Sequence, residues 1–476
     1  MQQHASTQQA TCNGTDLTFQ LSLELLPAGI AGRPLGELSV FSYVVDAPPQ
    51  EQESRPVLFL TNGGPGSASA FLHLSGIGPY RAAVPHDLAL GALPPYRIEI
   101  SETSILDVAD LVFLDAPRTG LGRIADDADP RGVYSVEGDA EMFAEAITTW
   151  VRRHQRWNSP KYFLGESYGT HRAAFLSSAV HGYGTAPLHG IALLGQAVNI
   201  QEVAERPGNV VGALANVPFK AATAWFHKKG STEYPTVEAA TEAALDFAWG
   251  DLSRAMLKGT CIDEDDLERT AAKLAVMIGI PAEELRRSRL WISKGEFRSR
   301  LLRDEGLTLG SSDARYAAPA VDASVGEQPF DASATRLLPQ YAAAMDLFLD
   351  DVLGVRERGP YIAADPEAVR NWTWDESGSA MFLKMGKPSP FHSYPYAARL
   401  SRWMKQVPTA RLFIGTGIYD SLTTVGAADH LTRQWDLPSE RVTSRWYRAG
   451  HMMYSDADVA ADLNADLRAF VTGAEV

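Results

Sequence analysis

Short, mostly apolar runs alternate with helix-like stretches over the first 200 residues of the chain. Such runs are typical of strands buried in the middle of a sheet, and they lie at 57–60, 111–114, 161–164 and 191–194. A further strand is predicted at 37–45, and helical spacing at 138–154 and 170–180. Strands that alternate with helices predict a mostly parallel sheet with helices on both faces, which is an α/β fold.

This pattern stops near residue 200. The following stretch is rich in Ala, Glu and Arg, and its apolar residues have helical spacing, as at 238–251 and 267–278. Two loop-like stretches interrupt it, at 307–333 and 374–391. A helical stretch of this length between two α/β parts indicates an insertion into the sheet domain rather than a continuation of the sheet.

The α/β pattern resumes with two predicted strands, at 410–414 and 442–447, and a last helix with Leu463 and Leu467 on its apolar face. We therefore expect three segments. They are the first part of the core with an N-terminal arm, a mainly helical cap and the second part of the core, at 1–200, 201–395 and 396–476.

Composition narrows the possible partners. The 476 residues carry a formal net charge of −15 and no run rich in Lys or Arg, which argues against a nucleic-acid partner because phosphates favour a basic face. No apolar run approaches the length of a membrane span. The two cysteines, Cys12 and Cys261, are expected to be free thiols, and no signal peptide is visible. A cytoplasmic location is the expectation, with a trimmed secreted protein as the alternative.

Residues 165–169 read Gly-Glu-Ser-Tyr-Gly, a G-x-S-x-G pentapeptide between a strand-like run and a helical pattern. A nucleophile elbow needs this context: a sharp turn that presents the serine hydroxyl and tolerates no bulk on either side. The pentapeptide alone is a weak signal, and the flanking pattern strengthens it. We predict that Ser167 is a catalytic nucleophile on an α/β-hydrolase fold.

A serine nucleophile needs a base and an orienting acid, and in this fold they follow in the order Ser, Asp or Glu, His. Asp420 and His451 each follow a predicted strand closely, where active sites lie in open α/β sheets. The alternatives fit less well and comprise the acids Asp429 and Asp456 and the histidines His392 and His430. Asp456 is predicted to cap the last helix instead.

A second signal is the Gly-rich turn Asn-Gly-Gly-Pro-Gly at 62–66, directly after an early strand. In this fold such a turn supplies one backbone N–H of the oxyanion hole, and glycines let the backbone approach the reacting carbonyl. Taken without the elbow, the same residues would fit an ordinary tight turn equally well.

With the elbow, the Gly-rich turn, the Asp420 loop and Gly450-His451-Met452 in this order and spacing, the chain resembles the serine carboxypeptidases. The resemblance runs from about residue 38 to the end and is strongest to the cysteine-poor bacterial branch. It implies that the N–H groups of Gly64 and Tyr168 form the oxyanion hole. It also implies that Asn62 and a protonated Glu166 bind the free carboxylate of a peptide, with Gly63 beside them.

Three positions depart from the family pattern. Where the family has a second carboxylate-binding glutamate, this chain has Gly76; a small residue is replaced by Arg118; and a cysteine after the Gly-rich turn is replaced by Ser67. We expect the hydrolase chemistry to be intact and the carboxylate recognition to be altered. Arg118 is a candidate substrate-binding residue that compensates for Gly76, although a structural or surface arginine is the more common case.

The sequence thus predicts a serine hydrolase that cleaves a peptide-like amide at a C-terminal residue, with no metal and no cofactor. An esterase, acyltransferase or biosynthetic tailoring hydrolase on the same scaffold is the first alternative, and a non-catalytic binding module the second. Because Gly76 removes a carboxyl neighbour, Glu166 should lose its proton at lower pH than in the family unless burial holds it. We expect an optimum near neutrality and little preference for free acids over amides.

Overall fold

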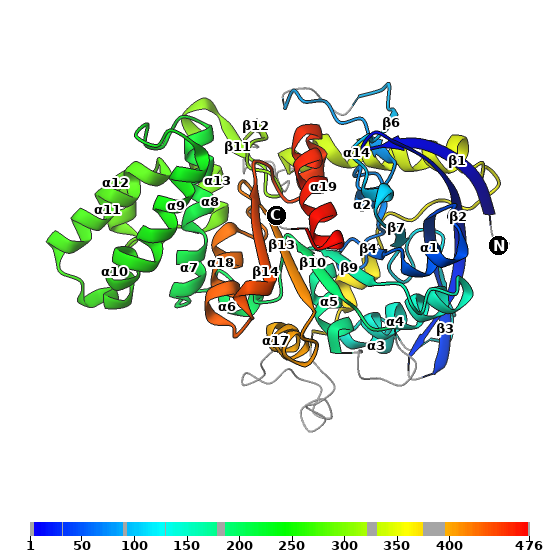
Figure 1. Cartoon of the computed structure of the whole chain (residues 1–476). Coiled ribbons are helices and arrows are strands. Elements are labelled where there is room, and N and C mark those ends of the chain that lie inside the picture. Colours follow the sequence, from blue (N-terminus) through cyan, green and yellow to red (C-terminus); the bar gives the residue numbers. More distant parts are fainter. Residues whose placement is uncertain are drawn as a thin grey trace.

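The computed structural model describes residues 4–30, 32–88, 93–128, 130–178, 186–320, 331–374 and 396–474. A large twisted sheet runs through its centre (Figure 1) in the order β1-β2-β3-β7-β4-β9-β10-β13-β14, with β8 paired to β3. The strands span β1 His4–Cys12, β2 Thr15–Ile30, β3 Arg33–Val45, β4 Val57–Thr61, β7 Asp110–Leu114, β8 Arg123–Ile124, β9 Lys161–Glu166, β10 Gly190–Leu194, β13 Arg411–Gly417 and β14 Val442–Tyr447.

The sheet is parallel where the sequence predicts it to be. β7, β4, β9, β10, β13 and β14 run parallel to one another, and each predicted buried strand lies within 3 residues of an observed one. The antiparallel edge formed by β1, β2 and β3 was predicted only in its third strand. Short hairpins lie outside the main sheet, β5 Tyr80–Ala82 with β6 Ile98–Ile100 and β11 Leu307–Leu309 with β12 Ala317–Pro319.

Alternate residues of the central strands pack on opposite faces of the sheet, as the pleat requires. In β4, Leu58 and Leu60 join one hydrophobic cluster, and Val57 and Phe59 join another. The first cluster is completed by α2 Ala70–His73, α14 Ala332–Leu347 and α19 Ala457–Thr472. The second is completed by α4 Val136–Arg153, α5 Gly169–Ser178, α17 Tyr396–Gln406 and α18 Val425–Gln434. Helices therefore cover both faces, as expected.

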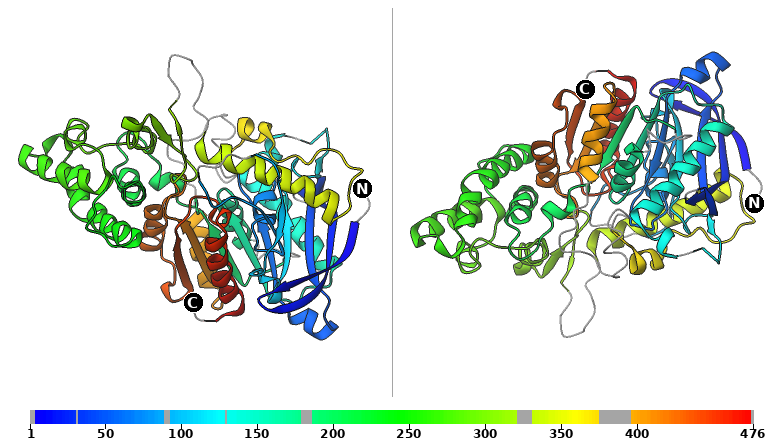
Figure 2. Two further views of the ribbon diagram at one scale, coloured as in Figure 1. Left: turned by 90° about the horizontal axis from the view of Figure 1, so that it is seen from above. Right: turned by 90° about the horizontal axis from the view of Figure 1, so that it is seen from below.

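The predicted insertion contains a helical body beside the sheet (Figures 1 and 2, left). It has its own hydrophobic cluster, with members from Ala213 to Ala314. Its helices are α7 Val210–Ala215, α8 Val217–Phe226, α9 Val237–Phe247, α10 Ser253–Lys258, α11 Glu264–Ile278, α12 Ala282–Arg287 and α13 Lys294–Arg300, preceded by α6 Ile200–Val203. We call residues 210–320 the cap.

The last part of the predicted insertion belongs to the core instead. On α14, Tyr341 and Met345 pack in the first sheet cluster. In Figure 2, left, α14 is the yellow-green helix that lies over the part of the molecule containing the sheet. α15 Pro366–Asn371 covers the Gly-rich turn, since a Cβ on Gly66 would meet Ala368. The loop predicted at 374–391 lies outside the described residues, apart from Trp374. Two further short α-helices are α1 Pro49–Ser54 and α3 Pro130–Val133.

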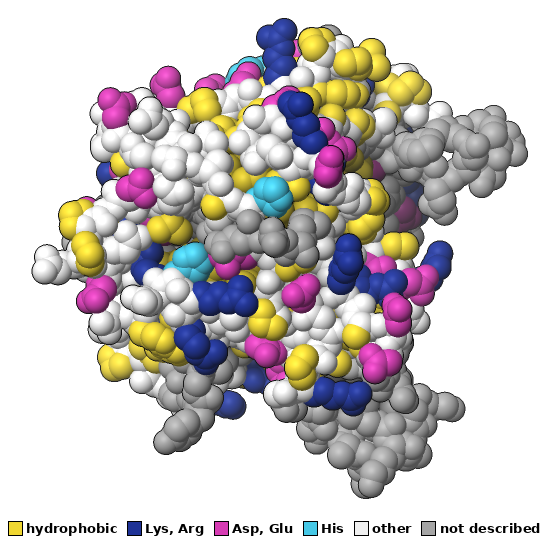
Figure 3. Space-filling view, turned by 90° about the vertical axis from the view of Figure 1, so that its right-hand side faces the viewer, with side chains coloured by type: hydrophobic (Ala, Val, Ile, Leu, Met, Phe, Trp, Pro, Cys, Tyr) yellow, Lys and Arg dark blue, Asp and Glu magenta, His cyan; other side chains and the backbone are white. Residues whose placement is uncertain are grey.

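Charged side chains of both signs lie on the surface of the molecule (Figure 3). On the face drawn in Figure 3, acidic and basic side chains are interspersed and neither sign gathers into a broad patch. Over the ranges that the structure describes, no helix combines the length and the apolar character that crossing a bilayer requires.

Candidate active site

Ser167 stands in the sharp turn between β9 and α5. Its backbone is left-handed, with φ 58°, and its N–H donates to the carbonyl of Leu194 on β10 at 2.9 Å. A Cβ on Gly165 would collide with the carbonyl of Gly169, so the turn accepts no side chain there. This is the strained strand–turn–helix geometry that presents a serine hydroxyl at the edge of a sheet, and Ser167 is only partly buried.

The Gly-rich turn after β4 packs directly on this elbow. A Cβ on Gly63 would collide with the backbone nitrogen of Tyr168, and Gly64 has φ 109°. Within the described ranges, the N–H groups of Gly64 and Tyr168 donate to no acceptor. Two unpaired backbone donors beside the serine are what an oxyanion hole requires, although this role of Gly64 and Tyr168 stays a prediction.

Asp420 and His451 meet at the ends of β13 and β14. His451 Nδ1 lies 2.7 Å from Asp420 Oδ2, and both side chains are buried. The hydroxyl of Thr423 also donates to Asp420 Oδ2, at 2.5 Å, and the Leu422 N–H donates to Oδ1 at 2.7 Å. With Nδ1 donating to Asp420, the second ring nitrogen, Nε2, is the one available to accept a proton.

The imidazole lies against the strand next to the elbow. Gly195, which follows the Leu194 carbonyl that holds Ser167, has φ 53°, and a Cβ there would approach His451 Cε1 to 2.8 Å. The two halves of the predicted triad are thus brought to one edge of the sheet. No hydrogen bond joins the Ser167 hydroxyl to the imidazole among the described residues; such bonds often form only when substrate binds.

Burial lowers the pKa of His451, but the charge of Asp420, its hydrogen bond and the charge of Glu166 outweigh this effect and raise the pKa above its usual range. The raised pKa describes an imidazolium that is well stabilised between two carboxylates. That is the state which a general base must reach after it has taken a proton.

Glu166 lies beside the elbow in a small buried network. Asn62 Nδ2 donates to Glu166 Oε2 at 3.0 Å, and the Tyr454 hydroxyl donates to the same oxygen at 2.6 Å. Burial raises the pKa of Glu166 to about 7, against the lowering effects of His451, Tyr454 and Asn62. Burial therefore lets Glu166 keep its proton to higher pH although position 76 is a glycine and not a second glutamate. The sequence analysis had left this possibility open.

Gly76 cannot accept a glutamate in the present loop without strain. It has φ 89°, and a Cβ would lie 3.0 Å from the Ser101 hydroxyl. Its carbonyl accepts from Ser101 Oγ at 2.7 Å and from Asn464 Nδ2 at 2.8 Å. The loop around Gly76 is thus held in its present shape by these hydrogen bonds.

Arg118 already has an acidic neighbour. Its Nε lies 3.5 Å from Asp365 Oδ2, which also accepts a hydrogen bond from the Tyr134 hydroxyl at 2.7 Å. The half-exposed guanidinium lines a cavity of about 420 Å³ together with Arg123 and Tyr134. Part of its charge is balanced by Asp365, so the structure favours the structural interpretation of Arg118; its contact with substrate stays a prediction.

The alternative triad residues have other partners. Asp429 accepts from Trp249 Nε1 at 2.8 Å and from Arg433 Nε at 2.6 Å. Asp456 caps α19, as expected, by accepting from the N–H groups of Asp458 and Val459. His430 lies 3.5 Å from Glu202. His392 lies outside the described residues.

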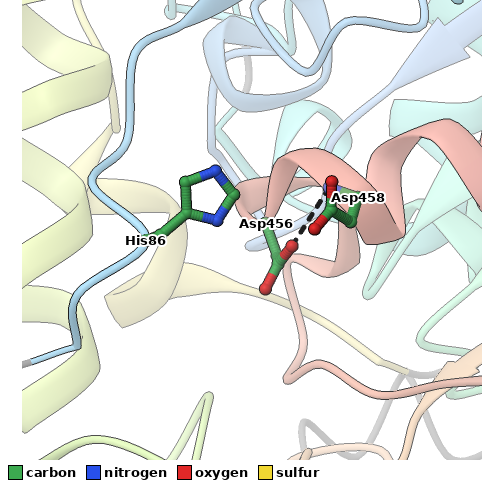
Figure 4. Close-up of side chains that lie close together, drawn as sticks. All are labelled: His86, Asp456 and Asp458. Carbon is green, nitrogen blue, oxygen red and sulfur yellow. Dashed lines mark hydrogen bonds between the residues drawn. The ribbon is translucent and has the colours of Figure 1, made fainter.

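One group of side chains in the described ranges has the spacing of metal ligands: His86, Asp456 and Asp458 (Figure 4). Asp456 is engaged as the cap of α19 and lies 3.5 Å from Arg315. His86 and Asp458 are exposed, and in Figure 4 the imidazole points toward Asp456. Because the central carboxylate serves the helix and an arginine, the group is explained without an ion.

Sequence analysis missed three contributors to the site: Thr423, Tyr454 and the loop Ser311–Arg315. Thr423 and Tyr454 each lie three residues after a predicted triad member, which was the available signal. The loop comes from the cap, and Ser312 O accepts from the His451 N–H at 2.6 Å while Ser311 O accepts from Ser421. Nothing in its sequence indicates which core residues it contacts.

The sheet order, the helices on both faces and the elbow define an α/β-hydrolase. Comparison with known proteins narrows the class. Residues 35–202 match the family model described as serine carboxypeptidase. The structure is similar to Kex1(delta)p, a prohormone-processing carboxypeptidase from Saccharomyces cerevisiae, with a TM-score of 0.55 and 14% identity over 96% of this chain and 91% of that one. At this identity the structural likeness shows the shared fold.

Two curated relatives are similar in sequence. Serine carboxypeptidase-like 26 from Arabidopsis thaliana is 30% identical over 158 residues, covering 32% of this chain and 31% of the relative. Serine carboxypeptidase-like 27 from the same plant is 27% identical over 150 residues, covering 30% of each chain. The chain thus matches about a third of the length of these relatives. Over residues 35–202 the resemblance to the serine carboxypeptidases is confirmed, and the fold of the described chain is that of an α/β-hydrolase.

Proposed function

We propose that this protein is a serine hydrolase that removes the C-terminal residue from a peptide or peptide-like substrate through an acyl-enzyme on Ser167. The observation that carries the proposal is the meeting, at one edge of the sheet, of the strained Ser167 turn and the hydrogen-bonded pair His451–Asp420. Two unpaired N–H groups, of Gly64 and Tyr168, lie beside that turn.

The chemistry follows from these positions. The Ser167 oxygen attacks the substrate carbonyl while His451 Nε2 takes its proton, and the N–H groups of Gly64 and Tyr168 stabilise the oxyanion. His451 then gives the proton to the leaving amine, which departs as the released C-terminal residue. Water repeats the sequence on the acyl-enzyme, with His451 as base, and frees the shortened peptide.

The preference for a C-terminal residue rests on Glu166 and Asn62. Glu166 is the residue before the nucleophile, it is buried, and its raised pKa lets it hold a proton near neutrality. A protonated carboxyl in a buried site can donate a hydrogen bond to a carboxylate, as the serine carboxypeptidase resemblance implies for Glu166.

Mass spectrometry of a peptide library incubated with the protein tests the proposal. We expect products shorter by one C-terminal residue, and their absence with Ser167→Ala, which should lower kcat by roughly 10⁴-fold or more and abolish labelling by a fluorophosphonate. Circular dichroism should be unchanged in the variant. Transfer of the acyl group to an added alcohol or amine would indicate an acyltransferase instead. Intact peptides together with no labelling of the wild type would indicate a binding module.

A further inference from the structure

Glu166 has a partner that the resemblance to the serine carboxypeptidases does not supply. The position of the second glutamate is Gly76, and the group that contacts the Glu166 carboxyl is the hydroxyl of Tyr454, at 2.6 Å. Tyr454 is 1% exposed, and it belongs to the turn that follows His451 rather than to the loop around Gly76. The partner of Glu166 therefore comes from a different part of the chain.

The hydrogen bonds to Glu166 are unequally shared between its two oxygens. Oε2 accepts from both Tyr454 and Asn62 Nδ2. Oε1 accepts from no described residue, and it is not among the fully enclosed atoms that lack a partner. Because two donors already point at Oε2, a proton on this carboxyl is favoured on Oε1, the oxygen that remains open to a ligand.

We propose that Tyr454 replaces the missing glutamate: by donating to Oε2 it holds Glu166 so that Oε1 carries the proton that hydrogen-bonds the free carboxylate of a peptide substrate. This inference rests on the proposed function. In it, Tyr454 is a positioning residue for substrate recognition, because it acts through Glu166 and not on the substrate itself.

Several polar and titratable groups face Glu166. They are His451 and Asp420 from the loops after β14 and β13, Asn62 from the Gly-rich turn, Tyr454, and Tyr341 on α14. Burial, His451 and Asn62 keep acting on Glu166 when the Tyr454 hydroxyl is absent. A hydrogen bond to the ionised carboxylate lowers the pKa of Glu166, so its removal raises that pKa further.

Tyr454→Phe tests the role of this hydroxyl, and Tyr341→Phe is the matched control. The Tyr341 ring lies 6.3 Å from that of Tyr454, it is equally buried, and its hydroxyl makes no hydrogen bond to Glu166. KM and kcat should be measured from pH 5 to 9 on a peptide and on its C-terminal amide. For Tyr454→Phe we expect KM for the acid to rise about 10-fold below neutrality, and the KM for the amide to change less than about twofold.

The direction of the pH shift separates this role from a merely structural one. In Tyr454→Phe the pH at which binding of the acid weakens should move upward, by about half a unit to one unit. Tyr341→Phe should leave both readouts as in the wild type. Equal losses on acid and amide, or a pH limb that does not move, would overturn the inference while the proposed hydrolysis stands.

Glu166→Gln is the second variant, since an amide keeps a donor and cannot ionise. Its KM for the acid should not rise with pH, and adding Tyr454→Phe should produce no further pH shift. A shift in the double variant would show that Tyr454 acts elsewhere. If the wild type releases no C-terminal residue from the peptide, the proposed function is wrong. That outcome is distinguishable from an effect of Tyr454, because it is observed in the wild type before any variant is compared.

Discussion

At the scale of single residues, Asp420 has the most constrained position in the site. Its two oxygens accept from His451, Thr423 and the Leu422 N–H, and its side chain has no exposed surface. A buried carboxylate that is fully hydrogen-bonded keeps one geometry, which is what orientation of an imidazole demands.

Asp420→Asn should therefore lower kcat by roughly 10⁴-fold. An amide nitrogen facing His451 Nδ1 would favour the tautomer with its proton on Nε2, which cannot accept the proton of Ser167. Rates of ester and peptide hydrolysis measure this directly. Asp429→Asn is the control, because Asp429 pairs with Arg433 and Trp249 away from the site. If Asp429→Asn loses most of its activity and Asp420→Asn keeps most of it, the third member of the triad has been misassigned.

The residues of the elbow could be predicted because their signal is local. Ser167 sits between glycines whose missing side chains are required by contacts within a few residues or with the neighbouring strand. Tyr454 and Thr423 could not be assigned to the site in the same way. Their hydroxyls reach Glu166 and Asp420 only because of the path that two loops take after β13 and β14, and the spacing of three residues from Asp420 and His451 does not by itself indicate that path.

At the scale of elements, the loop Ser311–Arg315 connects the cap to both loops that carry the predicted acid and base. Ser312 O accepts from the His451 N–H, the Ala314 N–H donates to Tyr419 O, and Asp313 Oδ2 accepts from the Gly450 N–H at 3.1 Å. Arg315 Nη2 pairs with Asp313 at 2.8 Å, and its Nη1 donates to Arg448 O. The loop thus ties the backbone on each side of His451 to the cap.

Removal of the guanidinium should loosen this connection. We expect Arg315→Ala to lower kcat by about 10- to 100-fold with little change in KM, because small displacements of a catalytic base cost rate rather than binding. Steady-state kinetics on a small ester and on a peptide should show the same loss. Arg303→Ala is the matched control, since Arg303 pairs with Glu284 inside the cap. A KM effect without a kcat effect would contradict the positioning role.

The strands of the parallel sheet were predictable, whereas only the third strand of the antiparallel edge was found. Buried strands such as β4 are continuous apolar runs, but β2 alternates, with Leu17, Phe19, Leu21 and Leu23 separated by polar residues. That period-two pattern was present in the sequence. The extent of the cap was harder to predict from the sequence, because helical spacing is the same in α13, which packs in the cap, and in α14, which packs on the sheet.

At the scale of the whole molecule, two opposing titrations shape the activity. In the proposed mechanism the neutral form of His451 is the base, so its raised pKa should make kcat increase as the solution becomes more alkaline. In the proposed function, binding of a free acid needs the protonated form of Glu166, so it should weaken as the pH rises through about 7. The sequence analysis expected little preference for free acids; burial of Glu166 now predicts such a preference below neutrality.

For free-acid peptides, kcat/KM should pass through a maximum near neutral pH, while the matched amides should show no falling limb there. Above about pH 7 the acid-to-amide ratio of kcat/KM should decrease by up to about tenfold per pH unit. A pH series on matched substrates measures the ratio. An acid-to-amide ratio that stays constant from pH 5 to 9 would show that Glu166 does not bind the C-terminal carboxylate of the substrate.

The contact of Ser311–Arg315 with the triad loops also has a consequence for heat inactivation. The cap has its own hydrophobic cluster beside the two that enclose the sheet, and it shares with the core a smaller cluster in which Ala222 and Leu245 pack with Ile418 and Val425. We predict that the cap unfolds as a cooperative unit of its own. When the cap melts, the backbone around His451 loses its hydrogen bonds to Ser312 and Asp313 although the sheet is still folded. We expect catalytic activity to disappear several degrees below the main calorimetric transition, together with a smaller, earlier heat-absorption peak. Coincident loss of activity and of the sheet in one transition would show that cap and core unfold together.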